Sequence, residues 1–280
     1  MSLNSRKLLR SLLLAGAVAT QLRGEIGVLA VTSSAGGARG LPGPGSLATV
    51  YCTGLTGISG IVAAPGSPFP TTLAGVRVNY AIYGDAPILA VADLRAYQLV
   101  NFQVPWSPNP GPVTLSQGSS SAVLADSAAP WGQFFTDPDG YVVAQHASDY
   151  RLVTAENPAR AGEWIIAYGS NFGEVVGPPP TGAATPLDRT APLDPGTPVG
   201  WLFRPQMIAT GVDVRLETNF IGLAPDLVGV YQINLRMPDT IPSGNVRVIV
   251  QRSRDCGFFF LQGCGRGLIL GFSSMPLLRH

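Results

Sequence analysis

The stretch YQLVNFQVP, Tyr97–Pro105, recurs later in the chain as YQINLRMP, Tyr231–Pro238, with one residue fewer. Upstream of each copy stands a second matching pair, GSLATVY at Gly45–Tyr51 and GEWIIAY at Gly162–Tyr168. Each copy therefore runs as a strand, a loop rich in proline and glycine, a strand pair, and a Tyr-Gln strand closed by proline. Self-similarity of this kind indicates a duplicated structural unit. We expect two modules of about 100 to 150 residues each, with a junction near Ser127–Pro130.

Apolar and polar residues alternate with a period of two in many short segments. Val76, Val78 and Tyr80 alternate with polar neighbours, and Val212–Glu217 and Val246–Val250 follow the same pattern. This period is typical of strands with one buried and one solvent-facing side. The 34 glycines and 25 prolines between these segments suit tight turns and oppose long helices. The sequence therefore predicts an all-β fold.

Composition excludes several classes of function. Only 12% of the residues are charged and the net charge is +1, so the chain lacks the basic surface that nucleic acid or an anionic membrane requires. Lys7 is the only lysine. Lys7 lies in the N-terminal segment that we interpret below as a signal peptide, so the processed chain would contain no lysine. This excludes Schiff-base chemistry and a P-loop lysine.

The N-terminus has the pattern of a signal peptide. Arg6, Lys7 and Arg10 precede the apolar run Ser11–Ala19, which ends in an A-x-A cleavage pattern at Ala17–Ala19. The run is too short to cross a bilayer, which takes about 20 residues. We expect a signal segment over residues 1–19, a secreted protein at the cell surface or outside it, and no membrane span. An amphipathic N-terminal helix packed on the body is the alternative.

Three motifs of the repeat resemble one bacterial family. NFQVPW at Asn101–Trp106, GLAP at Gly222–Pro225 and GVYQIN at Gly229–Asn234 are similar to motifs of the Solibacter-type uncharacterised C-terminal domain family. Its members are secreted acidobacterial proteins related to IPT/TIG Ig-like modules, and the similarity extends over about residues 40–250. The resemblance implies an extracellular protein of two tandem Ig-like (IPT/TIG-like) β-sandwich modules, but it implies no biochemical role.

On this basis we divide the chain into a signal peptide (1–19), a first Ig-like module (24–128) and a second Ig-like module (129–280). The second module departs from the family near its end. There it has an insertion, Arg254–Gly267, before the last strand. The insertion includes a loop near residues 256–264 that we predict to be closed by two cysteines.

The three cysteines predict a disulfide and a buried thiol. Cys256 and Cys264 are close enough in sequence to close a small loop in an oxidising compartment. Their spacing is not that of a zinc site, and only His146 and His280 are available as histidine ligands. We therefore predict no metal and no cofactor. Cys52 alternates with Val50 in a predicted strand, which indicates a buried, unreactive thiol.

The most unusual segment lies inside the predicted Cys256–Cys264 loop. Four large apolar residues stand in a row there, and a monomer seldom exposes such a cluster. It either plugs the open end of the second module or forms a surface for another subunit, another protein or a glycan. The apolar final strand is a candidate edge strand for pairing between chains. The predicted partner surface comprises Phe258, Phe259, Phe260, Leu261, Leu268, Ile269 and Leu270.

No catalytic motif is present. The chain has no G-x-S-x-G elbow, no P-loop and no H-E-x-x-H, so we predict a protein that is not an enzyme and has no catalytic residues. Asp137–Gly140 has two alternating aspartates, but a β-turn explains it better than a calcium loop. We interpret His146 as a surface residue without a partner.

These features predict a secreted, non-catalytic structural or adhesive protein. One form of this prediction is a subunit that self-assembles into a surface layer or filament. The main alternative is a carbohydrate-binding accessory module. The less favoured one is a glycoside hydrolase with paired carboxylates. The aromatic candidates for glycan contact are Trp106, Trp131, Trp201 and Phe258–Phe260, although those tryptophans also suit internal packing, and the carboxylate candidates are Asp85, Asp93, Asp213 and Glu217.

Overall fold

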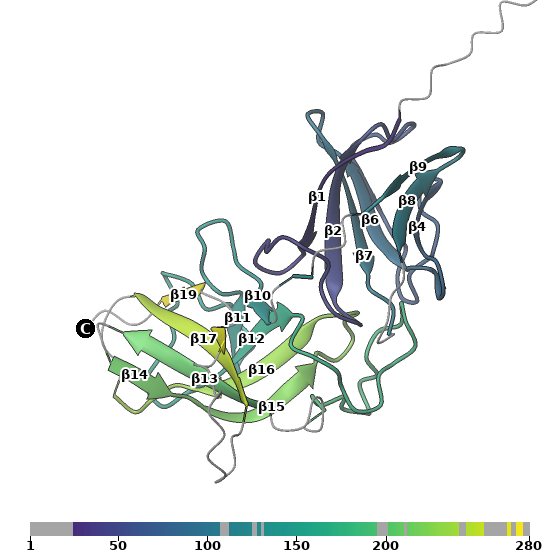
Figure 1. Cartoon of the computed structure of the whole chain (residues 1–280). Coiled ribbons are helices and arrows are strands. Elements are labelled where there is room, and N and C mark those ends of the chain that lie inside the picture. Colours follow the sequence, from purple (N-terminus) through teal and green to yellow (C-terminus); the bar gives the residue numbers. More distant parts are fainter. Residues whose placement is uncertain are drawn as a thin grey trace, which may run out of the picture.

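The computed structural model describes most of the chain as strands and connecting turns (Figure 1). No helix occurs among the described residues, and so none that could cross a membrane. The prediction of an all-β fold is confirmed. The described residues are 25–106, 112–124, 128–129, 132–194, 201–209, 212–240, 245–254, 268–269 and 273–276.

Strands β1–β9 form one body, which we call the N-terminal unit (Figure 1). It consists of two antiparallel sheets. Sheet 1 has the order β1 (Gly27–Ser33), β2 (Leu47–Thr53), β7 (Gln98–Gln103), β6 (Ile88–Asp93) and β3 (Ile61–Ala63). Sheet 2 has the order β5 (Gly84–Asp85), β4 (Val76–Tyr80), β8 (Val113–Gln117) and β9 (Ser120–Val123).

Strands β10–β19 form the second body, the C-terminal unit (Figure 1). Sheet 3 has the order β10 (Gln133–Phe134), β12 (Trp164–Ser170), β16 (Tyr231–Arg236) and β15 (Glu217–Leu223), with β11 (Ala144–His146) also paired to β12. Sheet 4 has the order β14 (Val212–Arg215), β13 (Trp201–Ala209), β17 (Asn245–Arg254) and β18 (Leu268–Ile269), with β19 (Ser273–Pro276) also paired to β17.

Each unit has its own hydrophobic core, drawn from both of its sheets. In the N-terminal unit Val50 and Phe102 of sheet 1 join Val78 of sheet 2 in one buried cluster. In the C-terminal unit Ile233 of sheet 3 and Val248 of sheet 4 belong to a second cluster. Two antiparallel sheets over one core are consistent with a β-sandwich in each unit.

The repeat seen in the sequence has the same pairing in both units. Strand β2 lies between β1 and β7, and β12 lies between β10 or β11 and β16. Leu47 pairs with Gln103, two residues before Pro105, and Trp164 pairs with Arg236, two residues before Pro238. Counted from the proline, the two registers are identical. The residue missing from the second copy is therefore lost at its Tyr-Gln end.

A β-bulge is also duplicated. In β6 the register shifts between Ile88 and Ala90, opposite the Asn101-Phe102 pair of β7. In β15 it shifts between Thr218 and Phe220, opposite the Asn234-Leu235 pair of β16. Both bulges stand at the same distance from the closing proline. Because a bulge bends a strand, both strand pairs have a bend at the same place relative to the proline.

The predicted single strand Val212–Glu217 is divided in the structure. Residues 212–215 form β14 in sheet 4, whereas β15 begins at Glu217 in sheet 3. Leu216 lies between them and is buried in the core. The alternation continued across this point because the chain changes sheets there while keeping an apolar residue inward.

Several predicted features lie outside the described residues. These are the signal segment (1–19), Cys256, Phe258, Phe259, Phe260, Leu261, Cys264 and Leu270. Leu268 and Ile269 form β18, the last strand in the order of sheet 4. The module boundary near Ser127–Pro130 falls between β9 and β10, where the structure describes only residues 128–129. These assignments stay predictions.

The prediction that Cys52 is buried is confirmed, and it gives a test of the N-terminal core. Cys52 has no exposed surface, and burial raises the pKa of its thiol from 9.0 to about 11. In a variant with Cys256→Ser and Cys264→Ser, we expect iodoacetamide at pH 8 to leave Cys52 unlabelled until denaturant is added, as measured by mass spectrometry. The stabilisation from burying the neutral thiol is present below pH 9 and is lost as the pH rises through 11. Rapid labelling of the folded protein would contradict this core.

Candidate functional site

The two units meet at a seam of buried polar groups. Ser170 has no exposed surface and stands at the end of β12. Its hydroxyl accepts a hydrogen bond from the Leu47 N–H at 3.1 Å and contacts the Gly229 carbonyl at 3.3 Å. The next residue, Asn171, accepts from the Gly43 N–H at 2.8 Å through its side-chain oxygen. The start of β2 is therefore fixed to the end of β12.

Gln103 forms the centre of the seam. It is the last residue of β7 and is fully buried. Its side-chain nitrogen donates to the Gly45 carbonyl at 3.0 Å, within the N-terminal unit. Its side-chain oxygen accepts from the Gly182 N–H at 2.6 Å, within the C-terminal unit. One carboxamide thus satisfies a backbone group of each unit, and its loss would leave both groups buried without a partner.

A loop of the C-terminal unit extends the seam along the N-terminal unit. It belongs to the long Pro/Gly-rich segment that follows β12 (Figure 1). The Gly182 carbonyl accepts from the Phe69 N–H at 2.9 Å, and Ala184 N–H donates to the Ser67 hydroxyl at 2.7 Å. Thr181 accepts through its hydroxyl from the backbone N–H of Trp106 at 3.3 Å. These bonds tie the loop down at several points.

Trp106 adds an apolar contact to the seam. It follows β7 in the N-terminal unit but is half-buried against the core of the C-terminal unit. Gly45 makes room for it, because a Cβ at Gly45 would stand 2.0 Å from the Trp106 ring. Gly45 also has a φ of +75°, which favours glycine. Trp106 therefore serves internal packing, which leaves it poorly placed as the exposed aromatic of a glycan site.

The contacts across the seam are hydrogen bonds of uncharged groups. Its polar members are amides, hydroxyls and backbone groups, with no ionisable side chain among the contacts described above. Buried hydrogen bonds of this kind favour one geometry, because an alternative leaves their donors and acceptors unpaired. The Ser46 hydroxyl and the Trp106 indole N–H are buried beside them without a partner among the described residues. These bonds therefore attach the start of β2 and the end of β7 to the C-terminal unit.

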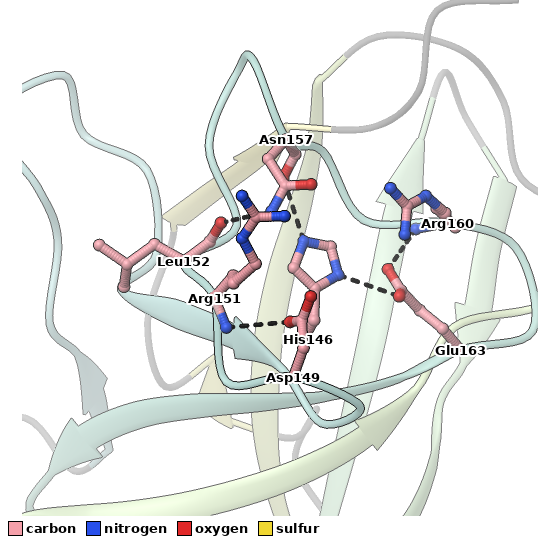
Figure 2. Close-up of polar contacts among 7 residues, drawn as sticks. All are labelled: His146, Asp149, Arg151, Leu152, Asn157, Arg160 and Glu163. Atoms are coloured by element: carbon pink, nitrogen blue, oxygen red, sulfur yellow. Dashed lines mark hydrogen bonds and ion pairs between the residues drawn. The ribbon is translucent and has the colours of Figure 1, made fainter.

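His146 is the one imidazole that the structure describes, and it is buried rather than exposed (Figure 2). Only 2% of its surface is accessible. Its Nδ1 lies 3.0 Å from Glu163 Oε2, and its Nε2 lies 3.2 Å from the Asn157 carbonyl oxygen. The prediction of an unpartnered surface histidine is wrong, because the alternation in β11 directs His146 inward together with Ala144.

The contacts of His146 hold a loop in place. The two ring nitrogens of His146 thus face two different acceptors, the Glu163 carboxylate and the Asn157 carbonyl oxygen. Glu163 also accepts from the Arg160 N–H, and Asn157 donates to the Leu152 carbonyl at 3.0 Å (Figure 2). His146 thus latches the loop between β11 and β12.

The remaining sequence candidates are not brought together. Asp85 contacts Arg77 at 3.9 Å and accepts from Asn79, and Asp93 accepts from the Arg95 N–H. Both lie in the N-terminal unit, in different sheets, whereas Glu217 lies in the C-terminal unit. The side chains of Asp213 and Trp201, and all of Trp131, lie outside the described parts.

The Asp137–Gly140 segment is a turn, as predicted. Its first aspartate accepts through its side chain from the N–H groups of Asp139 and Tyr141, and the Gly140 N–H donates to the Asp137 carbonyl. Across the described residues no group of three or more His, Cys, Asp or Glu side chains gathers as a metal site would require.

A scan against protein families and a search of curated proteins found no match to this chain. The resemblance to the Solibacter-type family therefore stays a prediction, and function has to be argued from the geometry of the chain itself.

The seam predicts a difference between two glutamines of the same strand. Gln98 bonds to Leu55 within the N-terminal unit, whereas Gln103 bonds across the seam. We expect Gln103→Leu to separate thermal unfolding into two transitions and to expand the molecule in small-angle X-ray scattering, with a loss of about 2 kcal/mol of coupling. Gln98→Leu is the matched control and should destabilise the N-terminal unit alone. A single transition and unchanged dimensions in Gln103→Leu would show that this bridge does not hold the units together.

The His146 latch predicts a loss of stability from a single substitution. His146→Ala leaves Glu163 without its buried partner and opens a cavity, so we expect the free energy of unfolding to fall by about 3 kcal/mol in urea titrations. Asp149→Ala, in the same loop but with only an exposed bond to the Arg151 N–H, should change it by less than about 1 kcal/mol. Equal effects of the two substitutions would argue against a latch at His146.

Proposed function

We propose that this chain is a secreted, non-catalytic structural or adhesive protein built from two tandem Ig-like modules. The observation that carries the proposal is the seam at Gln103, which joins the two units through buried hydrogen bonds. A rigid pair of sandwiches transmits position and force along its length, whereas an enzyme needs a pocket with reactive groups. The absence of any catalytic motif in the sequence agrees with this role.

The assignment of Ig-like modules is supported by the duplicated strand order. In both units the first strand of the repeat lies beside the Tyr-Gln strand, and the bulged strand follows on its other side. In each unit a short segment flanks the bulged strand, namely β3 beside β6 and residues 191–193 beside β15. The motifs that resemble the Solibacter-type family fall within these strands and the turns next to them. An extracellular location rests on the signal-peptide pattern of residues 1–19.

Self-association is the further part of the proposal. Strand β18 stands last in the order of sheet 4, and an edge strand offers free backbone groups to another chain. The apolar segment Phe258–Leu261 precedes it in sequence. A contact between an edge of one copy and a different surface of the next is heterologous, and repeated contacts of that type produce open filaments.

The test is the assembly state of the chain without residues 1–19. We expect light scattering to show growth with concentration and electron microscopy to show filaments or sheets. Ile269→Lys places a charge on β18 and should abolish assembly, because a charged edge resists pairing. Ile61→Lys is the matched control, since Ile61 is 72% exposed on the edge strand β3 of the N-terminal unit. A protein that stays monomeric at every concentration would overturn the assembly part of the proposal.

A further inference from the structure

Sheet 3 has an outer face that carries three aromatic rings. Alternation along β12 directs Ile165 and Ala167 into the core, so Trp164, Ile166 and Tyr168 point the other way, where Ile166 is only 7% exposed between the two rings. The same rule directs Gln232, Asn234 and Arg236 of β16 outward, because Ile233 and Leu235 are core residues. On β15 the core contact of Ile221 leaves Phe220 and Gly222 on the outer side.

The strand register places these residues in three rows. The first row is Trp164, Arg236 and Glu217. The second is Gln145, Ile166, Asn234 and Phe220. The third is Tyr168, Gln232 and Gly222. The rings of Trp164 and Tyr168 on β12 and of Phe220 on β15 therefore stand on either side of β16, which carries the amide side chains of Gln232 and Asn234.

The Phe220 ring points along its own strand, β15, toward Gly222. A Cβ at Gly222 would stand 2.4 Å from the Ala191 carbonyl oxygen, 2.7 Å from the Pro192 Cα and 2.8 Å from the Phe220 ring tip. The 191–192 backbone and the Phe220 ring therefore both border the place where Gly222 has no side chain. Phe220 is half-buried, which leaves part of the ring open to solvent. A ring held against a sheet loses little conformational freedom when a ligand stacks on it.

Tyr168 is held by a chain of hydrogen bonds. Its hydroxyl donates to the Gln145 side-chain oxygen at 2.7 Å, and the Gln145 amide donates to the Tyr150 carbonyl at 2.8 Å. Tyr168 and Trp164 are both half-buried, as Phe220 is. All three rings thus combine an anchored part with an accessible part.

The amides at the centre keep free bonding capacity. The Gln232 side-chain nitrogen donates to the Asn234 side-chain oxygen at 2.8 Å. The Gln232 oxygen and the Asn234 nitrogen have no partner among the described residues. This leaves one acceptor and one donor side by side, which suits a vicinal pair of hydroxyl groups.

The charges of the face are balanced locally. Arg236 contacts Glu217 at 3.7 Å and Asp239 at 2.9 Å. A phosphate-bearing ligand requires an excess of positive charge, which these contacts do not provide. Stacking rings with a neutral donor-acceptor pair favour a neutral ligand with both apolar C–H faces and hydroxyl groups, which is the chemistry of a hexose chain.

We propose that the outer face of sheet 3 binds a neutral polysaccharide that lies across β12, β16 and β15. Pyranose rings stack on Trp164 and Phe220, and their hydroxyl groups bond to the Gln232 oxygen and the Asn234 nitrogen. The matching position in the N-terminal unit serves another purpose, because Leu47, the counterpart of Trp164, is only 7% exposed and belongs to the seam. The site consists of described strands and does not depend on self-association.

The experiment uses the chain without residues 1–19. Retention on insoluble cellulose, mannan, xylan and β-1,3-glucan is followed by calorimetric titration with cellohexaose, mannohexaose, xylohexaose and laminarihexaose. We expect binding to at least one of them, weakened about tenfold by Trp164→Ala and by Phe220→Ala. Trp164→Phe should restore part of the affinity, and melting curves show that each variant is folded.

Tyr97→Ala is the matched control. Tyr97 is an aromatic residue of the N-terminal unit, is 36% exposed, and lies outside sheet 3. It should leave the affinity unchanged. Binding to none of the glycans, an equal loss in Tyr97→Ala, or full affinity in a folded Trp164→Ala, Phe220→Ala double variant would each overturn the site. Filament formation without glycan binding would overturn this inference alone, and glycan binding by a monomer would overturn only the assembly proposal.

Discussion

The Gln103 carboxamide is the constraint on which the shape of this molecule depends. It is buried and bonds to the backbone of both units, so neither unit can turn without leaving an amide or a carbonyl unsatisfied. Trp106 contacts the C-terminal core close to this carboxamide, and its ring occupies the place that a side chain at Gly45 would take. Apolar contacts alone would permit sliding between the units. Directional bonds at the centre of the seam select one orientation.

A fixed orientation changes what the outer surfaces can do. The aromatic face of sheet 3 and the edge strand β18 belong to the C-terminal unit, and the seam joins that unit to the smaller N-terminal unit. A ligand bound to the C-terminal unit is then kept at a constant distance from a partner bound to the N-terminal unit. Flexible tandem domains lose part of each binding free energy to the freedom of the linker, and a rigid pair avoids that loss.

The sequence predicted the strands better than the contacts between them. The repeat at Tyr97–Pro105 was visible because strand alternation and a closing proline are local patterns, and the structure assigns both copies the same register. The seam was not visible, since Gln103 and Ser170 look like ordinary strand residues and their partners are far away in the sequence. His146 was misjudged for the same reason: its partners become neighbours only when the loop before β12 folds back. Trp164 was not predicted as a contact for a glycan, because the sequence showed it only as part of the repeated strand.

The duplicated bulge sets where this chain can gain or lose a residue. A shift of one residue inside a paired strand would exchange its buried and exposed faces, so the stretch between the bulge and the closing proline has a fixed length in both units. The opposite, Tyr-Gln end already differs by one residue between the copies. Positions counted back from the proline are therefore equivalent in the two copies, and the difference in length between them lies at the Tyr-Gln end. We therefore expect that the β6–β7 hairpin can be replaced by the β15–β16 hairpin when the two segments are joined at the closing proline.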